Sequence, residues 1–319
     1  MAIKNRKIFI TGGAGFIGSM LASKLYQDNE LVLYDNLARN SIQYTNLLEY
    51  SSVKLIKGDI LEYESVKKAM CGADMVIHAG AITGIDTVSK YPVATMEVNM
   101  IGTANILRAC VENGVKERVI EFSTSEIFGS MAHKVSSSTK AVIGSVGESR
   151  WVYAVSKLAG EHLAYAYYQQ YNLPTVTLRP FNVYGPRQTG EGAIQNFIIQ
   201  ALRGEDIFIY GDGMQIRAWC FIDDMIDGVL KALEHPNAIG KSFNIGNSRT
   251  VITIYALAKM VCRVLNSKSE IVFKDALSAD IEMRTPNIEE ANRLIGFNAK
   301  VDLEEGILLT AKWYRENGF

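Results

Sequence analysis

A glycine-rich turn near the start of the chain places the strongest limit on how the chain can fold. The short apolar run 7–10 ends at this turn, where Gly12, Gly15 and Gly18 follow one another at intervals of three residues. Residues 19–27 then have the pattern of an amphipathic helix. Glycines at this spacing form a tight turn, let the backbone approach a pyrophosphate and allow close helix packing. The order of strand, turn and helix therefore predicts a dinucleotide-binding unit.

An acid at the end of the second strand indicates which dinucleotide binds. Residues 30–35 form an apolar run that ends in Asp35. A carboxylate at this point accepts hydrogen bonds from the adenosine ribose and repels a 2′-phosphate, which favours NAD over NADP. Arg39 lies close by and leaves NADP open. The residues expected to hold this part of the cofactor are Gly12, Gly15, Phe16, Ile17, Gly18, Asp35 and Asn36.

Strands and helices alternate through the first half of the chain. Further strands are expected at 53–58, 75–78, 118–123 and 174–179, with helices at 63–71 and 102–112. This order predicts an α/β fold with a doubly wound parallel sheet (Rossmann), in which ligands bind at the carboxyl ends of the strands. The residues expected beside the nucleotide at these ends are Asp59, Ile60, Ala79, Gly80, Ala81 and Asn99.

The alternation loosens after the sixth strand. Helices are expected at 193–202, 223–233, 254–265 and 303–317, and short strands at 207–210, 217–221 and 271–273. We expect an NAD-binding domain over residues 1–180 and a smaller mixed α/β substrate-binding lobe over 181–319, with interleaved segments. The polar stretch 130–150 is expected to be a long loop that overhangs the substrate.

A tyrosine and a lysine four residues apart open the helix that follows this loop. Tyr153 and Lys157 share one helix face, so both side chains can reach the same pocket. A phenol has an unperturbed pKa of about 10 and is a poor base at neutral pH, but a neighbouring cation favours the phenolate. The pair therefore suits proton transfer.

The overall charge excludes several classes of partner. The 319 residues include 33 basic and 34 acidic side chains, a net charge of −1, which gives no reason to bind nucleic acid or an anionic membrane. No stretch approaches the roughly 18 uncharged apolar residues of a membrane span. The four cysteines and four histidines are scattered without metal-ligand spacing. We expect a cytoplasmic protein with no metal site.

The glycine turn, the strand-end acid, Thr124 and the Tyr153–Lys157 pair, in this order, resemble the extended short-chain dehydrogenase/reductases, in particular the NAD-dependent nucleotide-sugar epimerase/dehydratase family. The resemblance runs nearly end to end. It implies that NAD stays bound while Tyr153 takes the proton of a sugar 4-hydroxyl, Lys157 holds the ribose and Thr124 hydrogen-bonds the reacting oxygen. It further implies a homodimer built on the Lys157 helix, and a nucleotide-diphosphate sugar, UDP favoured, held by Asn182, Asn196, Tyr210, Arg217 and Arg284.

The residues after Thr124 bear on what happens to the 4-keto sugar. Thr-x-Glu with Glu126 is similar to the 4,6-dehydratases and uronic-acid decarboxylases of the family, and a glutamate there could remove the C5 proton. Ser125 stands where deoxythymidine-type dehydratases carry an acid. Gly192–Ile194 lacks the arginine that is usual in decarboxylases, and Trp151-Val152 replaces a common Ser-Pro. The expected catalytic residues are Thr124, Ser125, Glu126, Tyr153 and Lys157.

Four functions follow from these residues, and a fifth reading is not enzymatic. The first is 4,6-dehydration of a nucleotide-diphosphate hexose, slightly ahead of decarboxylation. A 4-epimerase, in which Glu126 merely hydrogen-bonds the sugar, is the main rival, and net oxidation at C4 is a further one. A nucleotide-sensing regulator with a decayed site is disfavoured because all the catalytic residue types persist.

Overall fold

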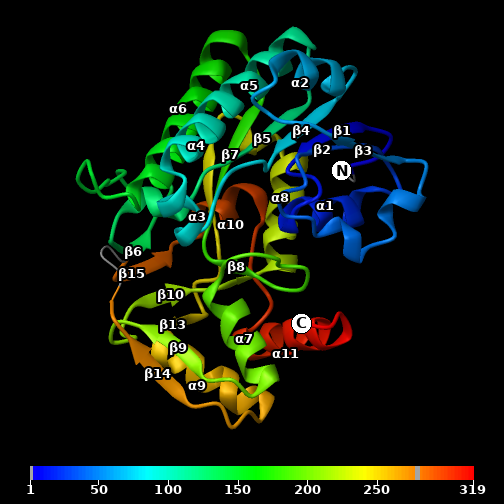
Figure 1. The fold of residues 1–319 in the computed structure, drawn as a ribbon. Helices are drawn as coiled ribbons and strands as arrows, with labels where there is room; N and C mark the ends of the chain where they lie inside the picture. Colours follow the sequence, from blue (N-terminus) through cyan, green and yellow to red (C-terminus); the bar gives the residue numbers. More distant parts are fainter. Residues whose placement is uncertain (1–2, 277–280) are drawn as a thin grey trace.

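The computed structural model describes residues 3–276 and 281–319 and contains a large parallel sheet, as the alternation predicts (Figure 1). Its strands lie in the order β12-β7-β5-β4-β1-β2-β3, and every pair of neighbours is parallel. The bounds are β1 Lys7–Thr11, β2 Glu30–Asp35, β3 Val53–Lys57, β4 Met75–His78, β5 Arg118–Phe122, β7 Thr175–Pro180 and β12 Ser242–Ile245. The doubly wound α/β fold is confirmed.

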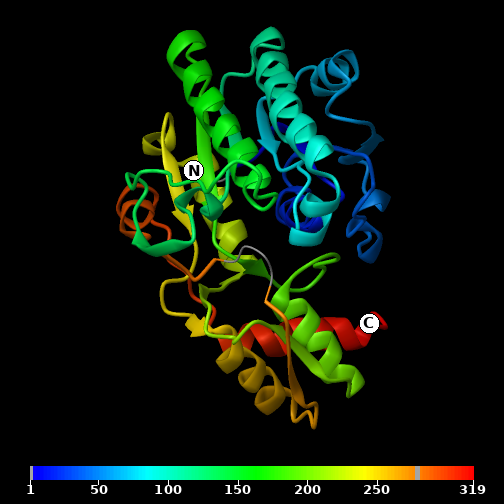
Figure 2. The same cartoon turned by 60° about the vertical axis from the view of Figure 1, so that its left-hand side comes forward.

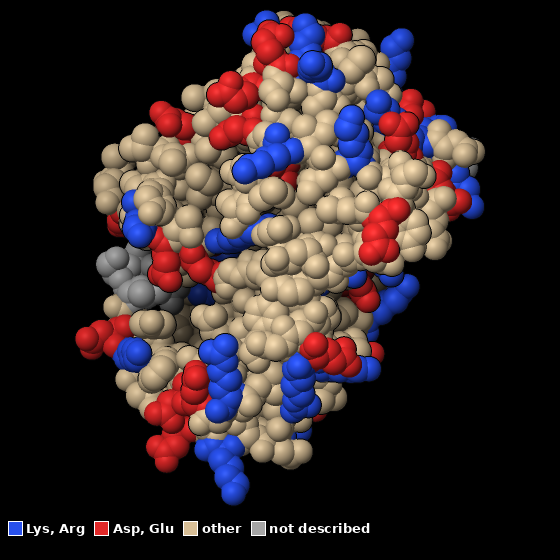
Figure 3. Space-filling model, turned by 45° about the vertical axis from the view of Figure 1, so that its right-hand side comes forward, with Lys and Arg blue, Asp and Glu red and all other residues tan. Residues whose placement is uncertain are grey.

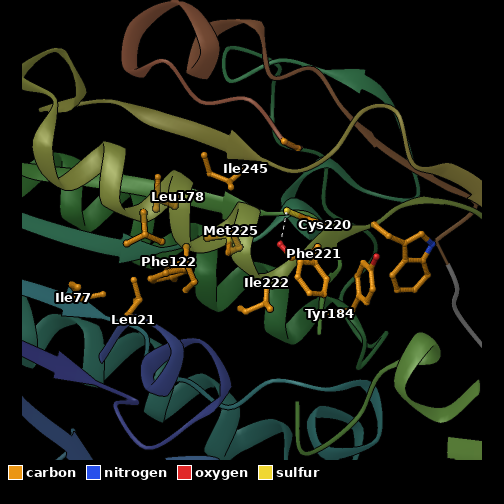
Figure 4. Close-up of a cluster of buried hydrophobic side chains, with 14 of the residues drawn as sticks. Leu21, Ile77, Phe122, Leu178, Tyr184, Cys220, Phe221, Ile222, Met225 and Ile245 are labelled. Atoms are coloured by element: carbon orange, nitrogen blue, oxygen red, sulfur yellow. Dashed lines mark hydrogen bonds between the residues drawn. The ribbon is translucent and has the colours of Figure 1, made fainter. Parts of the chain in front are cut away.

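The central strands are apolar runs because both faces of the sheet are covered. Alternate side chains along β1 enter two different cores, with Ile8 and Ile10 on one face and Phe9 on the other. Figure 4 shows the first core, where Ile222 and Met225 of a helix lie against sheet residues such as Phe122 and Leu178. The fold is therefore fixed by burial on both sides of one sheet.

Helices cover the two faces unequally (Figures 1 and 2). On the first face lie α1 Phe16–Leu25 and α8 Ile222–Glu234, and on the second lie α2 Tyr63–Met70, α5 Gly102–Glu112 and α6 Trp151–Tyr171. Helix α1 begins at Phe16, earlier than the expected residue 19, because Gly15 already has extended backbone at the N-cap. Helix α5 continues an unpredicted run made of α3 Ile85–Lys90, α4 Pro92–Met96 and the π-helical turn η3 Glu97–Ile101.

The second lobe is built from small sheets. A mixed four-stranded sheet has the order β13-β10-β15-β6, and two parallel pairs join β8 to β11 and β9 to β14. The strands are β6 Met131–Val135, β8 Val183–Tyr184, β9 Ile207–Tyr210, β10 Ile216–Ala218, β11 Cys220–Phe221, β13 Val251–Thr253, β14 Ile271–Lys274 and β15 Met283–Pro286. The helices of this lobe are α7 Ala193–Arg203, α9 Ile254–Leu265 and α11 Leu303–Glu316, whereas α10 Glu289–Ile295 packs against β12 of the large sheet. Short 3₁₀ turns are η1 Ile42–Tyr44, η2 Leu47–Glu49, η4 Ser125–Phe128 and η5 Pro236–Ala238.

Segments are exchanged between the two halves of the chain. Strand β12 and helix α8 come from beyond residue 180 and join the large sheet, whereas β6 comes from before it and joins the small one. The expectation of a continuous loop over 130–150 is wrong at its start, because residues 131–135 gain a hydrogen-bonding partner in β15. The expected strand 217–221 is likewise two short strands on either side of Trp219.

Charged side chains of both signs are interspersed over the face seen in Figure 3, without a large patch of one sign. This agrees with the net charge of −1. Within the ranges that the structure describes, no helix is long and apolar enough to cross a membrane. Those residues also contain no cluster of three histidine, cysteine or acidic side chains that could hold a metal ion.

Candidate active site

The glycine turn between β1 and α1 is too tight for side chains at several of its positions, Gly12 and Gly18 among them. Gly12 has a φ of +65°, and a Cβ there would lie 2.8 Å from the backbone of Ala79 and Gly80. A Cβ on Gly18 would collide with the Gly12 carbonyl oxygen. Gly15 caps α1 without a side chain, so the first backbone amides of this helix face the turn. This is an arrangement that binds a pyrophosphate.

Asp35 ends β2 with its carboxylate turned toward the glycine turn. Its Oδ2 accepts a hydrogen bond from the Ala14 amide at 3.1 Å and its Oδ1 accepts one from the Leu37 amide at 2.7 Å. Burial raises the pKa of Asp35, and these backbone hydrogen bonds oppose the rise. An ionised carboxylate offers about four acceptor sites, so capacity is left for ribose hydroxyls. The exposed Asn36 accepts a hydrogen bond from the Ala38 amide at 3.0 Å.

The other residues expected at the cofactor follow the carboxyl ends of β3 and β4, at the sheet edge that carries the glycine turn: Asp59, Ile60, Ala79, Gly80 and Ala81. Asn99 lies in the π-helical turn and is buried. Its side chain accepts from the Ile82 amide at 2.8 Å and donates to the Ile82 carbonyl at 3.0 Å and the Ser156 hydroxyl at 3.1 Å. Asn99 therefore braces the loop after β4 against α6.

Helix α6 brings Tyr153 and Lys157 to the carboxyl end of β5. The side chains of Thr83 and Thr124 face the Tyr153 phenol and lower its pKa. Thr124 also caps η4 by accepting a hydrogen bond from the Glu126 amide at 3.2 Å. The sequence predicted Thr124 at this point but missed Thr83, which belongs to the irregular loop after β4.

The electrostatics of Tyr153 differ from the simple expectation. Burial raises the pKa of Tyr153 and outweighs Lys157, which lowers it together with the hydrogen bonds from Thr83 and Thr124. The charge of Glu126 raises this pKa further. Lys157 by itself therefore does not bring the phenol into the working range, so a second cation beside it is needed.

Glu126 forms an ion pair with an arginine from the other lobe. Arg284 Nη1 donates to Glu126 Oε1 at 3.3 Å, and the Arg284 side chain is 6% exposed. Arg217 of β10 is the register partner of Arg284 of β15, so the two buried arginines stand side by side in the small sheet. Arg284, expected among the residues that hold the sugar nucleotide, is thus joined to the expected catalytic acid. Ser125, beside Glu126, is buried.

The remaining residues expected at the substrate differ in exposure. Asn182 has a φ of +37° and donates to the Ala218 carbonyl at 2.7 Å, which joins the β7–β8 connection to β10. Asn196 on α7 and Tyr210 at the end of β9 are exposed. Neither side chain is engaged with the catalytic pair in this structure, and their roles stay predictions.

Two buried groups that the sequence reasoning did not assign lie under Lys157. Lys157 Nζ donates to Glu121 Oε1 at 3.0 Å, and His78 Nε2 lies 4.0 Å from Glu121 Oε2. Glu121 could have been noticed from the sequence, because an acid inside the apolar run 118–122 has to be buried if that strand is central. His78 was expected to be structural, and its ring is fully hydrogen-bonded to Thr11 and Thr103.

The fold and the glycine cradle define an enzyme of the NAD-binding, extended short-chain dehydrogenase/reductase class. The family model described as the NAD dependent epimerase/dehydratase family matches residues 8–246, and the chain belongs to this family. NAD is its cofactor, and the excluded side chains at Gly12 and Gly18 together with the strand-end Asp35 fit that molecule.

The chain is similar over almost its full length to enzymes with different reactions. It is 32% identical to UDP-N-acetyl-α-D-glucosaminuronate decarboxylase of Bacillus cytotoxicus, with 98% of each chain covered. UDP-glucuronic acid 4-epimerase of Bacillus cereus, solved with UDP-glucuronic acid and NAD, superposes with a TM-score of 0.89 at 30% identity, covering 98% of this chain and 99% of that one. The dTDP-glucose 4,6-dehydratase of Streptomyces venezuelae, with NAD bound, gives 0.89 at 28% identity, covering 98% and 97%. The chain is therefore an NAD-dependent enzyme of nucleotide-sugar chemistry.

Proposed function

We propose that this enzyme decarboxylates a UDP-linked uronic acid through a 4-keto intermediate. The observation that carries the proposal is the Glu126–Arg284 ion pair at 3.3 Å, whose carboxylate is near enough to Tyr153 for its charge to raise the pKa of that phenol. A guanidinium at this point matches a carboxylate on the sugar carbon next to the one that is oxidised. The decarboxylase similarity over 98% of the chain supports the same reaction.

The first step is oxidation at C4. Tyr153, as the phenolate, takes the proton of the 4-hydroxyl while Thr83 and Thr124 stabilise the charge on the phenol oxygen. Lys157 contributes a buried positive charge one helical turn away. NAD, which the glycine turn and Asp35 would hold, would supply the hydride acceptor for C4 and, as oxidised nicotinamide, a second cation.

The second step follows from the chemistry of the ketone. A uronic acid oxidised at C4 is a β-keto acid, so the C5–C6 bond breaks, CO₂ leaves and its electron pair forms the C4 enolate. Arg284 orients the C6 carboxylate before this step, and the enolate oxygen lies toward Tyr153 and Thr124. A proton from water then adds to C5, and the cofactor that was reduced in the first step would supply the hydride that reduces C4 again. No external oxidant or reductant is consumed.

Dehydration, which the sequence placed first, makes different demands on the same residues. It requires Glu126 as a base for the C5 proton and an acid for the departing 6-hydroxyl. Glu126 is engaged by Arg284, and the neighbouring position holds the hydroxyl of Ser125 rather than an acid. Dehydration is therefore the second candidate, supported by the likeness to the Streptomyces dehydratase.

A mass-resolved assay tests the proposal. The purified enzyme is incubated separately with UDP-glucuronate, UDP-N-acetylglucosaminuronate, UDP-glucose and dTDP-glucose. Loss of CO₂ from a uronate supports the proposal. Loss of water from a neutral hexose shows dehydration, and unchanged mass with a new sugar configuration shows epimerisation; either of these without decarboxylation overturns it.

A further inference from the structure

A buried acid lies directly beneath the catalytic lysine. Glu121 on β5 and Lys157 on α6 are 1% and 2% exposed, and their side chains are joined at 3.0 Å. Gly160, one turn after Lys157, leaves room for this contact, since a Cβ there would lie 3.2 Å from Glu121 Oε1. Two residues of helix α6 therefore meet Glu121 of β5: Lys157 donates to it, and Gly160 leaves space for it.

The other side of Glu121 offers no positive charge. His78 on β4 faces it at 4.0 Å, but burial and the charge of Lys157 lower the pKa of His78 to about 3, so the ring is neutral. The hydroxyl of Thr103 donates to the Asn99 carbonyl, which leaves its oxygen to accept from His78 Nε2. The ring proton thus points at Thr103 rather than at Glu121.

Several charged groups of the described residues surround the pair. Burial raises the pKa of Glu121, the charge and hydrogen bond of Lys157 oppose the rise, and Glu161 on α6 adds to it. Tyr153 faces Lys157 and Glu126. Glu161 is itself paired with Arg179. A buried ammonium needs a compensating charge to stay protonated, and among these groups Glu121 is the one in contact with it.

We propose that Glu121 is the counter-ion of the Lys157 ammonium and holds it in place beneath Tyr153. Glu121 is 1% exposed and bonds Lys157, so it is a positioning residue that acts through Lys157. The proposal rests on C4 oxidation by Tyr153, which decarboxylation, dehydration and epimerisation share, and does not depend on which of them follows.

Removing the negative charge has a defined consequence for the pH profile. The Tyr153–Lys157 pair loses two protons as the pH rises. In Glu121→Gln, both protons leave at a lower pH than in the parent enzyme, whichever of the two groups loses its proton first. Both limbs of the bell-shaped profile of kcat/KM therefore move to lower pH, by on the order of one unit. The profile is recorded with whichever sugar nucleotide is turned over, so failure of the decarboxylase proposal leaves this test intact.

A second measurement needs no substrate. In the Glu121→Gln holoenzyme, Lys157 sheds its uncompensated charge as the pH rises, so the destabilisation relative to the parent enzyme shrinks between pH 7 and pH 10. The folding equilibrium constant of the variant, divided by that of the parent enzyme, should rise roughly tenfold between pH 7 and pH 10, which corresponds to one pKa unit. Urea unfolding at each pH measures it.

The chain supplies a matched control in Glu161→Gln, another buried acid on α6. Its partner Arg179 does not lose its proton in this range, so the destabilisation should be the same at both pH values and the bell should not move. If Glu121→Gln does not fold, Glu121→Met fills the same space without a charge and carries the same expectations. The proposal is overturned if the pH profile of kcat/KM does not move in the Glu121 variant and its destabilisation is the same at both pH values. Equal shifts in the Glu161→Gln control also overturn it.

Discussion

Two carboxylates five residues apart in the chain, Glu121 and Glu126, each pair with a cation, and their surroundings are opposite. Glu121 is sealed between β5 and α6, both part of the large sheet and its cover. Glu126 is 17% exposed at its side chain and pairs with Arg284 of the small sheet. One pair is therefore internal to the cofactor-binding layers, and the other joins two lobes.

The difference separates two parts of the chemistry. Under our proposals, the buried Glu121–Lys157 pair serves the oxidation of C4 in a site where water does not weaken the pair. The Glu126–Arg284 pair would contact the part of the sugar that distinguishes one reaction from another. Because Arg284 comes from a different lobe, it can be changed without disturbing the cradle of the cofactor.

The largest effect is expected from Tyr153→Phe, which should block C4 oxidation and therefore every later step. Without the phenol there is no base for the 4-hydroxyl, and turnover should fall by about 10²–10⁴-fold or more. The glycine turn is untouched, so NAD released on denaturation should match the parent enzyme. Turnover near the parent rate would contradict the mechanism.

Arg284→Met should separate C4 oxidation from CO₂ release. Loss of the guanidinium should slow CO₂ release by about 10²-fold, in line with the removal of one preorganised charge-stabilising donor. Oxidation of C4 depends on Tyr153 and should persist, so reduced cofactor should accumulate in a single turnover with a uronate. Absorbance of the reduced nicotinamide and mass of the product measure the two steps.

Arg284→Lys is the control for this change. It keeps the charge without the planar fork and should recover part of the rate. If Arg284→Met slows C4 oxidation and CO₂ release equally, the open pair is not specific to the second step.

The sequence predicted the cofactor end better than the substrate end, for a physical reason. Gly12, Gly18 and Asp35 form a local pattern within two strands and one helix, and local geometry fixes what they do. The Glu126–Arg284 pair joins residues 158 positions apart through a strand pairing between β6 and β15. That pairing was hidden because residues 131–135 were predicted as the start of the polar loop 130–150.

Burial also reversed one electrostatic expectation. Spacing placed Lys157 beside Tyr153 correctly, but it carries no information on desolvation, which raises the pKa of this phenol. The role of Glu121 was missed for a similar reason, since a single acid in an apolar strand does not reveal its partner. The pKa of Tyr153 and the partner of Glu121 both depend on strand register and on depth in the sheet, which residue type alone does not give.

Low pH should lower the free energy of unfolding through His78, which lies beside the buried Glu121. Its pKa is lowered from 6.5 to about 3, so its contribution to stability is complete above pH 6.5 and is lost as the pH falls toward 3. At pH 5 the loss is about 2 kcal/mol, from 1.36 kcal/mol for each of roughly 1.5 units. Urea unfolding at pH 7 and pH 5 should show a drop that is smaller by this amount in His78→Gln. Equal drops in both proteins would mean that His78 takes up its proton without cost.

The smallest effect is expected from Arg217→Gln, which tests whether the two adjacent arginines divide their work. Arg217 is the register partner of Arg284 but is expected to hold the diphosphate, which is bound alike in the ground and transition states. Its loss should therefore raise KM about tenfold, the size of one charge-assisted hydrogen bond, and leave kcat within about twofold. UDP alone carries the same diphosphate, so its inhibition constant should rise by the same factor. Arg284→Met is the matched variant and should bind UDP as the parent enzyme does. If both changes weaken UDP equally, the arginines act as one anion site, and Arg284 returns to the role in sugar-nucleotide binding that the sequence first suggested for it.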